Sequence, residues 1–180
     1  MTTTAMTGRA PLHRSAVAVI IAGCAIAMLG FGPRSVLGLF LEPMTVARGW
    51  DRETFALAMA IQNLLWGIGV PIAGAFADRF GPSRVILLGT VLYVGGVYGM
   101  AISESSLALH FFGGLMTGLG VAFTAFSLVL AAIARVVGPE RRSLALGLGT
   151  AAGSFGQVVF SPLTQAMIDQ LGWFDALVAL

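Results

Sequence analysis

Residues 54–102 read TFALAMAIQNLLWGIGVPIAGAFADRFGPSRVILLGTVLYVGGVYGMAI, and this stretch decides the fold. It contains two apolar runs, 54–77 and 85–102, separated by a short loop that carries Asp78, Arg79 and Arg84. Each run reaches or approaches the ~20 apolar residues that a helix needs to cross a bilayer. Because the bilayer core offers no water to backbone polar groups, such runs cross it as helices. The stretch therefore predicts a transmembrane helical hairpin.

Further apolar runs lie on both sides of this hairpin. We predict helices at about 15–41, 54–77, 85–102, 107–135 and 144–168, followed by the start of a sixth at 173–180 and preceded by a tail at 1–14. The composition agrees, since 57% of the 180 residues are apolar and 10% are charged, whereas a soluble domain carries roughly 25% charged residues. The sequence predicts an all-α, polytopic membrane protein whose sixth helix is incomplete, so that the chain is a truncated record or a natural short product.

The arginines predict the orientation, because cytoplasmic connections are rich in basic residues. The tail and the second and fourth connections contain seven arginines, namely Arg9, Arg14, Arg79, Arg84, Arg135, Arg141 and Arg142. The first, third and fifth connections contain two, Arg48 and Arg52. We expect a multi-pass protein of the inner (plasma) membrane with a cytoplasmic N-terminus.

The loop of the hairpin carries a recognisable motif. Gly74, Asp78, Arg79 and Gly81 form a G-x-x-x-D-R-x-G pattern, which is followed by the basic residue Arg84. This pattern resembles the signature of the major facilitator superfamily, which lies between helices two and three on the cytoplasmic side. The resemblance implies a cytoplasmic gate at these five residues. It also implies two six-helix halves, each a 3+3 inverted repeat, that rock around a central site. This chain would supply the N-terminal half of a twelve-helix transporter, and the C-terminal half would be missing.

A second resemblance narrows the substrate. The segments GPRSVLGLFLEPM (32–44), GWDR (49–52), RRSLALG (141–147) and GW (172–173) together look like the monocarboxylate and oxalate–formate branch of this superfamily. The branch implies a small organic anion as substrate, moved with or without a proton. Phe123 stands where related transporters often have a tyrosine that faces the pathway. The resemblance therefore makes Phe123 a candidate for substrate contact, while the difference weakens the transfer of one specific substrate.

Arg34 is the charged residue that lies well inside an apolar run. An arginine at that depth is costly and marks a functional site by default. Its guanidinium could hold a carboxylate by two parallel hydrogen bonds, or its long side chain could extend to the outer membrane surface. Gln62, Asn63 and Gln157 are further candidates for substrate contact, because they are large polar residues near the middle of predicted helices. For these three the alternative is a hydrogen bond between helices.

Two other functions stay open from the sequence. The first is a multidrug or other solute exporter on the same fold. Against it, the helix-four arginine of drug–proton antiporters is absent, and Gly114 and Thr117 stand in its place. A transport-incompetent membrane fragment or assembly partner is the second. The sequence shows no phosphate loop, nucleophile–base pair or metal-ligand cluster, so we expect no enzyme, no metal and no cofactor. The basic residues lie between apolar runs and so indicate a lipid bilayer rather than nucleic acid as partner.

The orientation can be tested with reporter fusions. We expect alkaline phosphatase fused after Gly81 to be inactive, because that loop is predicted to be cytoplasmic. The same enzyme fused after Gly49, in the first connection, should be active and serves as the control. An active fusion after Gly81 would reverse the orientation.

Overall fold

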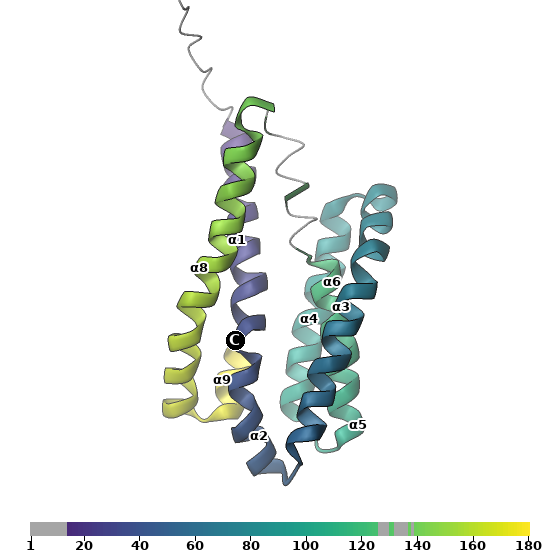
Figure 1. Cartoon of the computed structure of the whole chain (residues 1–180), viewed down its shortest axis with the longest axis vertical. Coiled ribbons are helices and arrows are strands. Elements are labelled where there is room, and N and C mark those ends of the chain that lie inside the picture. Colours follow the sequence, from purple (N-terminus) through teal and green to yellow (C-terminus); the bar gives the residue numbers. More distant parts are fainter. Residues whose placement is uncertain (1–13, 126–129, 132–136, 138) are drawn as a thin grey trace, which may run out of the picture.

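The computed structural model describes residues 14–125, 130–131, 137 and 139–180, and the described part is helical throughout its long segments (Figure 1). Its elements are α1 (Arg14–Val36), η1 (Leu37–Phe40), α2 (Leu41–Arg48), α3 (Arg52–Phe80), α4 (Pro82–Ile102), α5 (Ser106–Leu109), η2 (His110–Met116), α6 (Thr117–Phe123), α8 (Pro139–Leu171) and α9 (Trp173–Ala179). Within these residues, five helical segments are long and apolar enough to cross a membrane: Val17–Arg48, Arg52–Phe80, Pro82–Ile102, Ser106–Phe123 and Arg142–Leu171. The prediction of an all-α, polytopic protein is confirmed.

The first span is longer than the sequence suggested. We expected it to end at residue 41, whereas η1 and α2 continue the helical backbone to Arg48. The Thr45 hydroxyl donates a hydrogen bond to the Leu41 carbonyl (2.7 Å), and Gly49 ends the helix in the left-handed conformation (φ 66°). The apolar run stops before the charged residue Glu42, but a helix can extend beyond the apolar core when its end is capped in this way.

The other predicted ranges differ from the observed helices mainly at their ends. Helix two begins at Arg52 and continues to Phe80, helix three begins at Pro82, and helix five spans Pro139–Leu171. Of the predicted range 107–135, the described helix ends at Phe123, and residues 126–129 and 132–136 lie outside the described part. Residues 1–13 of the predicted tail also lie outside it.

The helices form two groups (Figure 1). In the first, α1 and α8 run parallel and closely packed, because glycines remove side-chain bulk at their contacts. A Cβ on Gly32 would overlap the Phe160 ring, and a Cβ on Gly156 would lie 3.0 Å from the Met28 side chain. Small residues at such contacts are the usual means by which helices approach in lipid.

The second group contains α3, α4 and the fourth span, in which α4 runs antiparallel to its neighbours. Its contacts also rest on glycines: a Cβ on Gly89 would lie 2.7 Å from Phe123, and one on Gly120 would lie 2.6 Å from the Tyr93 Cα. The fourth span includes a wide helical turn, η2, after which the Thr117 hydroxyl donates to the carbonyl of Phe112, five residues earlier (2.7 Å).

The two groups meet at the end opposite the Asp78 loop. A buried apolar cluster there draws on both, with Leu37, Phe40, Met44, Phe55, Ala58, Val97, Met100, Ala101, Leu109, Ala176 and Leu177. Polar contacts add to it: an Arg48 guanidinium nitrogen donates to the Ala101 carbonyl (3.2 Å), and a His110 ring nitrogen lies 3.0 Å from the Thr54 carbonyl oxygen.

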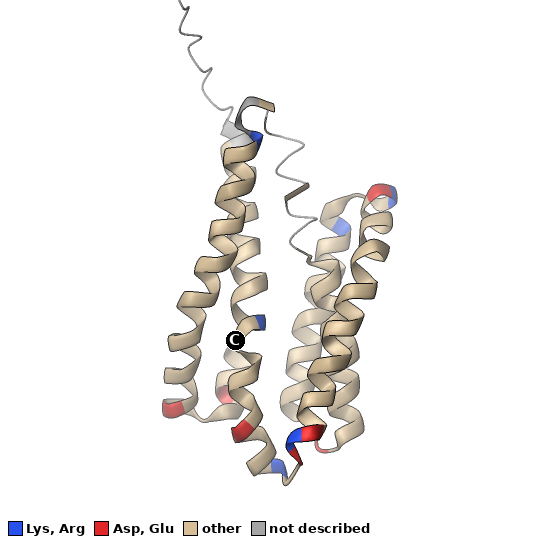
Figure 2. Cartoon of the chain, viewed as in Figure 1, with Lys and Arg blue, Asp and Glu red and all other residues tan. Residues whose placement is uncertain are grey.

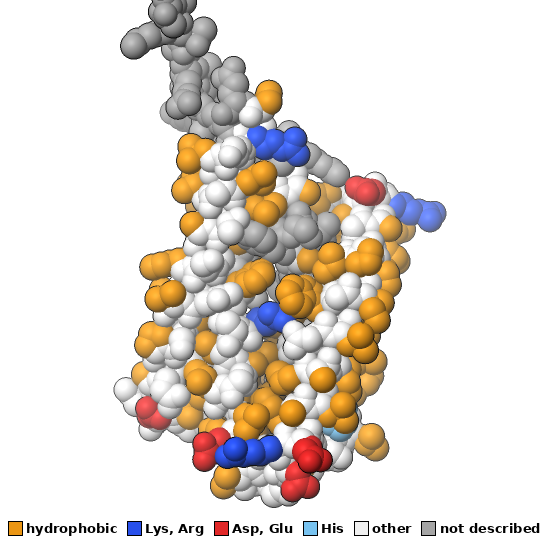
Figure 3. Space-filling model, viewed as in Figure 1, with side chains coloured by type: hydrophobic (Ala, Val, Ile, Leu, Met, Phe, Trp, Pro, Cys, Tyr) orange, Lys and Arg blue, Asp and Glu red, His pale blue; other side chains and the backbone are white. Residues whose placement is uncertain are grey.

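The outer surface suits a bilayer. Most of the charged residues lie at the two ends of the helices (Figure 2), and hydrophobic side chains cover much of the face between them (Figure 3). Leu64, Val91 and Val158 are among the large hydrophobic residues that are more than half exposed. Exposed apolar surface of this extent is what lipid chains cover.

The glycine contacts lead to a stability prediction. Gly120→Ala should lower the free energy of unfolding by about 1–3 kcal/mol, because the new methyl group meets the Tyr93 backbone, which cannot move aside cheaply. Gly67→Ala is the matched control, since a Cβ there meets no atom within 4 Å. Thermal unfolding in detergent would measure both, and equal stabilities would contradict this packing.

Candidate functional site

Arg34 reaches from α1 across to α3, and so links the two helix groups. Its Nη2 donates a hydrogen bond to the Asn63 Oδ1 (2.6 Å). Its Cζ lies 4.1 Å from the centre of the Trp66 ring, in a cation–π contact. Asn63 is oriented in turn, because its Nδ2 donates to the Met59 carbonyl (2.8 Å). Asn63 and Trp66 stand three residues apart on α3, so both side chains lie on the same face of that helix.

The guanidinium lies near the middle of the membrane-spanning region. Trp66 is the central residue of α3, fourteen residues from either end of Arg52–Phe80. A helix of that length extends over roughly 43 Å at 1.5 Å per residue. The contacts of Arg34 are therefore with the centre of α3 and not with the end of the helical segment that carries it, near Arg48.

The local backbone explains how α1 presents Arg34. Pro33 occupies the last part of α1 and has no backbone N–H to donate to the preceding turn. The Ser35 hydroxyl donates to the Gly32 carbonyl (2.7 Å), and the backbone tightens into η1 after Val36. Since Gly32 packs directly on Phe160 of α8, the opposite side of α1 is left for Arg34 to meet α3.

The positive charge of Arg34 is met by neutral groups. Its partners among the described residues are the Asn63 amide oxygen and the Trp66 indole face. Tyr93 of α4 lines a pocket together with Pro33, the residue that precedes Arg34. Two buried donors, the Arg34 Nε and the Tyr93 hydroxyl, have no hydrogen-bond partner among the described residues. The arrangement can therefore bind an anionic acceptor.

Tyr93 did not stand out in the sequence. The one available signal was that it is one of two tyrosines in the chain and lies in the third apolar run. Its proximity to Arg34 depends on how α4 is rotated, which hydropathy does not report.

The predicted site residues do not all come together. Arg34 and Asn63 are in contact. Gln62 lies on a different face of α3, where it is 3% exposed and its backbone packs against Gly118 of α6. Its Nε2 has no hydrogen-bond partner within the described part of the chain. Adjacent helix residues point about 100° apart, so Gln62 and Asn63 face different surroundings.

Gln157 and Phe123 lie elsewhere. Gln157 is exposed on α8 and lines a small pocket of about 80 Å³ with Phe31 and Ser154, between α1 and α8. The Phe123 ring centre is 6.0 Å from that of Phe76, and the ring packs against a buried cluster that includes Ala73. Phe123 therefore lies near the Asp78 loop and not beside Arg34.

The motif loop forms a sharp turn between α3 and α4. Gly81 has φ 88° and ψ 146°, a conformation that suits glycine, and its N–H donates to the Ala77 carbonyl (2.9 Å). The Arg79 Cζ lies 5.4 Å from the Phe80 ring centre, and Arg84 is exposed in the first turn of α4.

Gly74, the first glycine of the motif, makes no close contact with another helix of the described chain. A Cβ at that position would meet nothing within 4 Å in the described part of the chain. No helix of the described chain therefore needs a glycine there, and this face of α3 is open.

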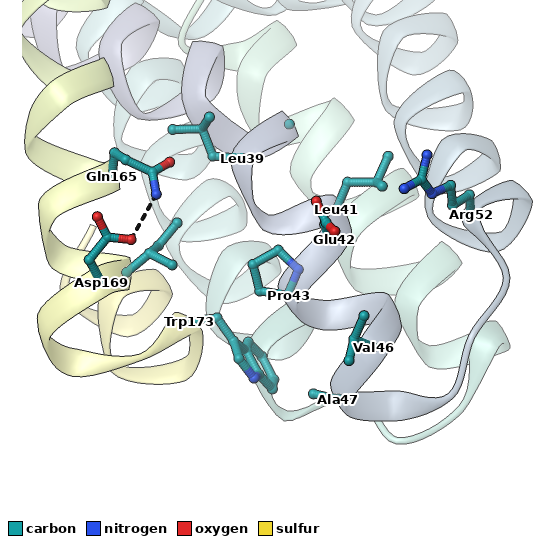
Figure 4. A pocket seen from close by; sticks show the side chains of 12 residues that line it. Leu39, Leu41, Glu42, Pro43, Val46, Ala47, Arg52, Gln165, Asp169 and Trp173 are labelled. Carbon is teal, nitrogen blue, oxygen red and sulfur yellow. Dashed lines mark hydrogen bonds between the residues drawn. The ribbon is translucent and has the colours of Figure 1, made fainter.

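A separate pocket of about 700 Å³ lies at the other end, between α2 and the α8–α9 turn (Figure 4). Glu42, Arg52 and Trp173 line it, and there the Gln165 amide nitrogen donates to the Asp169 carboxylate (2.9 Å). Among the residues that the structure describes, no three His, Cys, Asp or Glu side chains gather closely enough to hold a metal ion.

A multi-span helical bundle with one arginine at mid-depth is typical of membrane transport proteins. The sequence profile of the Major Facilitator Superfamily matches residues 16–178. The chain belongs to this superfamily, and so to a class of transporters and not of enzymes.

Individual relatives agree with this membership. Monocarboxylate transporter 11 of Mus musculus is 30% identical over 169 residues, which is 89% of this chain and 36% of the relative. Monocarboxylate transporter 13 of Rattus norvegicus is 29% identical over 150 residues, 83% of this chain and 35% of the relative. MFS-type transporter 1 of an Ophiocordyceps species is 24% identical over 86% of this chain. The chain spans about a third of the length of these relatives.

The contacts of Arg34 predict opposite effects of two substitutions on stability. Arg34→Met keeps the apolar stem and removes a charge whose placement at mid-membrane costs about 2.5–3.5 kcal/mol on insertion scales. We expect its stability to equal or exceed that of the wild type. Asn63→Leu removes the acceptor and leaves the charge in place, which should cost about 1–3 kcal/mol.

Thermal unfolding in lipid nanodiscs would compare the two variants. If the Arg34→Met protein were less stable than the wild type and the Asn63→Leu protein equally stable, the hydrogen bond from Arg34 to Asn63 would not be what offsets the cost of the buried charge.

Proposed function

We propose that this chain is the N-terminal part of a secondary active transporter that moves a small organic anion, with monocarboxylates as the substrate class. The observation that carries the proposal is the position of the Arg34 guanidinium. It contacts the centre of α3, and its Nε–H has no hydrogen-bond partner among the described residues. The names of two of the relatives, monocarboxylate transporters 11 and 13, support the same substrate class.

A carboxylate suits this group for a physical reason. Guanidinium N–H donors lie in a plane with fixed spacing and match the two oxygens of a carboxylate, and such charge-assisted bonds are stronger than neutral ones. Asn63 and Trp66 hold the guanidinium in place, so less side-chain entropy is lost when the anion binds. A carboxylate would also balance a positive charge that the surrounding neutral groups leave uncompensated.

Alternating access is the mechanism that we propose for this site. The N-terminus would be cytoplasmic, the gate residues Asp78, Arg79 and Arg84 would open and close that side, and a C-terminal half would rock against this chain. The open face at Gly74 offers room for such a partner helix. Because a guanidinium stays protonated at any physiological pH, a coupled proton would travel on another residue or on the substrate carboxyl.

Substitutions at Arg34 test the proposal. In proteoliposomes that contain the transporter with its C-terminal half, we expect uptake of labelled lactate and propionate. Arg34→Met should lower the apparent affinity about 10- to 100-fold, because charge-assisted hydrogen bonds contribute roughly 1.5–3 kcal/mol. The apparent affinity of Arg34→Lys should lie between those of the wild type and Arg34→Met, since lysine keeps the charge but loses the planar donor geometry.

Arg52→Met is the matched control. It removes an arginine from the 700 Å³ pocket between α2 and the α8–α9 turn and leaves the site around Arg34 unchanged. An Arg34→Met protein with the wild-type affinity for both anions would refute the substrate role of Arg34. A wild-type protein that transports neither anion would refute the substrate class.

A further inference from the structure

Tyr93 is a partly buried residue with a buried hydroxyl, and it lies at about the same depth as the Arg34 site. It lies near the middle of α4, eleven residues after Pro82 and nine before Ile102. Its backbone is held against Gly120 of α6. Its side chain lines a mostly apolar pocket of about 170 Å³ together with Pro33, the residue that precedes Arg34, and with Val97 and Leu177.

The Tyr93 hydroxyl is buried without a hydrogen-bond partner among the described residues, and the same holds for the Arg34 Nε. Buried polar groups in folded proteins are nearly always paired, so each such exception calls for an explanation. Tyr93 and Pro33, the residue that precedes Arg34, line the same pocket, so α4 brings the Tyr93 side chain to the part of α1 that carries Arg34. Since both can donate, the missing partner is an acceptor, and the positive charge of Arg34 favours an anion.

We propose that the Tyr93 hydroxyl is a second donor of the anion site and hydrogen-bonds the carboxylate that Arg34 holds. This inference rests on the proposed function and adds a residue to it. It makes the site a junction of three helices, because Arg34 comes from α1, its supports Asn63 and Trp66 come from α3, and Tyr93 comes from α4. A bound carboxylate thereby draws together the two helix groups of the fold.

A purely structural role for the hydroxyl makes a different prediction. A hydroxyl that stabilised the empty protein through a hydrogen bond would cause a loss of stability on removal. A hydroxyl that waits for a ligand is a cost to the empty protein, so its removal should leave the unliganded protein as stable as before or more stable.

The decisive variant is Tyr93→Phe, which removes one oxygen and keeps the ring, so that the packing on Gly120 is retained. We expect its dissociation constant for labelled propionate, measured with the purified protein in nanodiscs, to rise about tenfold, which is the loss for one hydrogen bond of about 1.4 kcal/mol. Its Tm without ligand should be equal to or above that of the wild type. Tyr98→Phe is the matched control, because Tyr98 lines the same pocket but is 53% exposed, and its affinity should not change.

The outcomes separate this inference from the function on which it rests. Wild-type protein that binds propionate, together with Tyr93→Phe protein that binds it equally well, would overturn the role of Tyr93 and leave the role of Arg34 intact. A clear fall in the Tm of unliganded Tyr93→Phe would also overturn it, because the hydroxyl would then be structural. Wild-type protein that binds no carboxylate would overturn both proposals.

Discussion

The structure depends on how one guanidinium is kept at the centre of a bilayer-spanning fold. Lipid offers no hydrogen bonds, so a charge at that depth must be satisfied by the protein itself. Here a neutral amide and an indole face meet Arg34, and both come from the central turn of α3. Neutral partners hold the guanidinium in position without neutralising it. A carboxylate partner would have satisfied it fully, and the site would then have little attraction left for an anion.

The position of Arg34 follows from helix packing on the other side of α1. Gly32 leaves room for the Phe160 ring, and Gly156 lets α8 approach Met28 of α1 closely. This packing fixes which face of α1 points toward α3. The apolar cluster around Phe40, Phe55 and Met100 joins the two helix groups at one end of the molecule. The polar contact at mid-depth is thus set by apolar contacts on either side of it, and a change in those contacts would move the charge.

Much of the fold could be predicted from the sequence, because the length and polarity of each run report directly on membrane crossing. The turn at Gly81 was also predictable, since a glycine followed by a proline ends a helix. The rotation of each helix about its axis could not be predicted. Asn63 and Gln62 are neighbours with similar chemistry, yet Asn63 meets Arg34 while Gln62 is buried on another face of α3. Tyr93 was missed for the same reason, and the helical continuation to Arg48 was missed because a cap, and not hydropathy, defines that end.

The wide turn η2 has a consequence for the fourth span. Such a turn holds one residue more than a regular α-helical turn, so it acts as an insertion placed inside a helix without a loop. The residues before it, such as Leu109, face the buried cluster at one end, and those after it, such as Gly118 and Gly120, fit against α3 and α4. Loss of a single residue from this turn would restore the ordinary pitch and rotate one half of the span against the other by about 100°. The span would still cross the bilayer, but its glycines would no longer meet their neighbours. A one-residue deletion that leaves the hydropathy unchanged would therefore remove the contact between Gly120 and Tyr93.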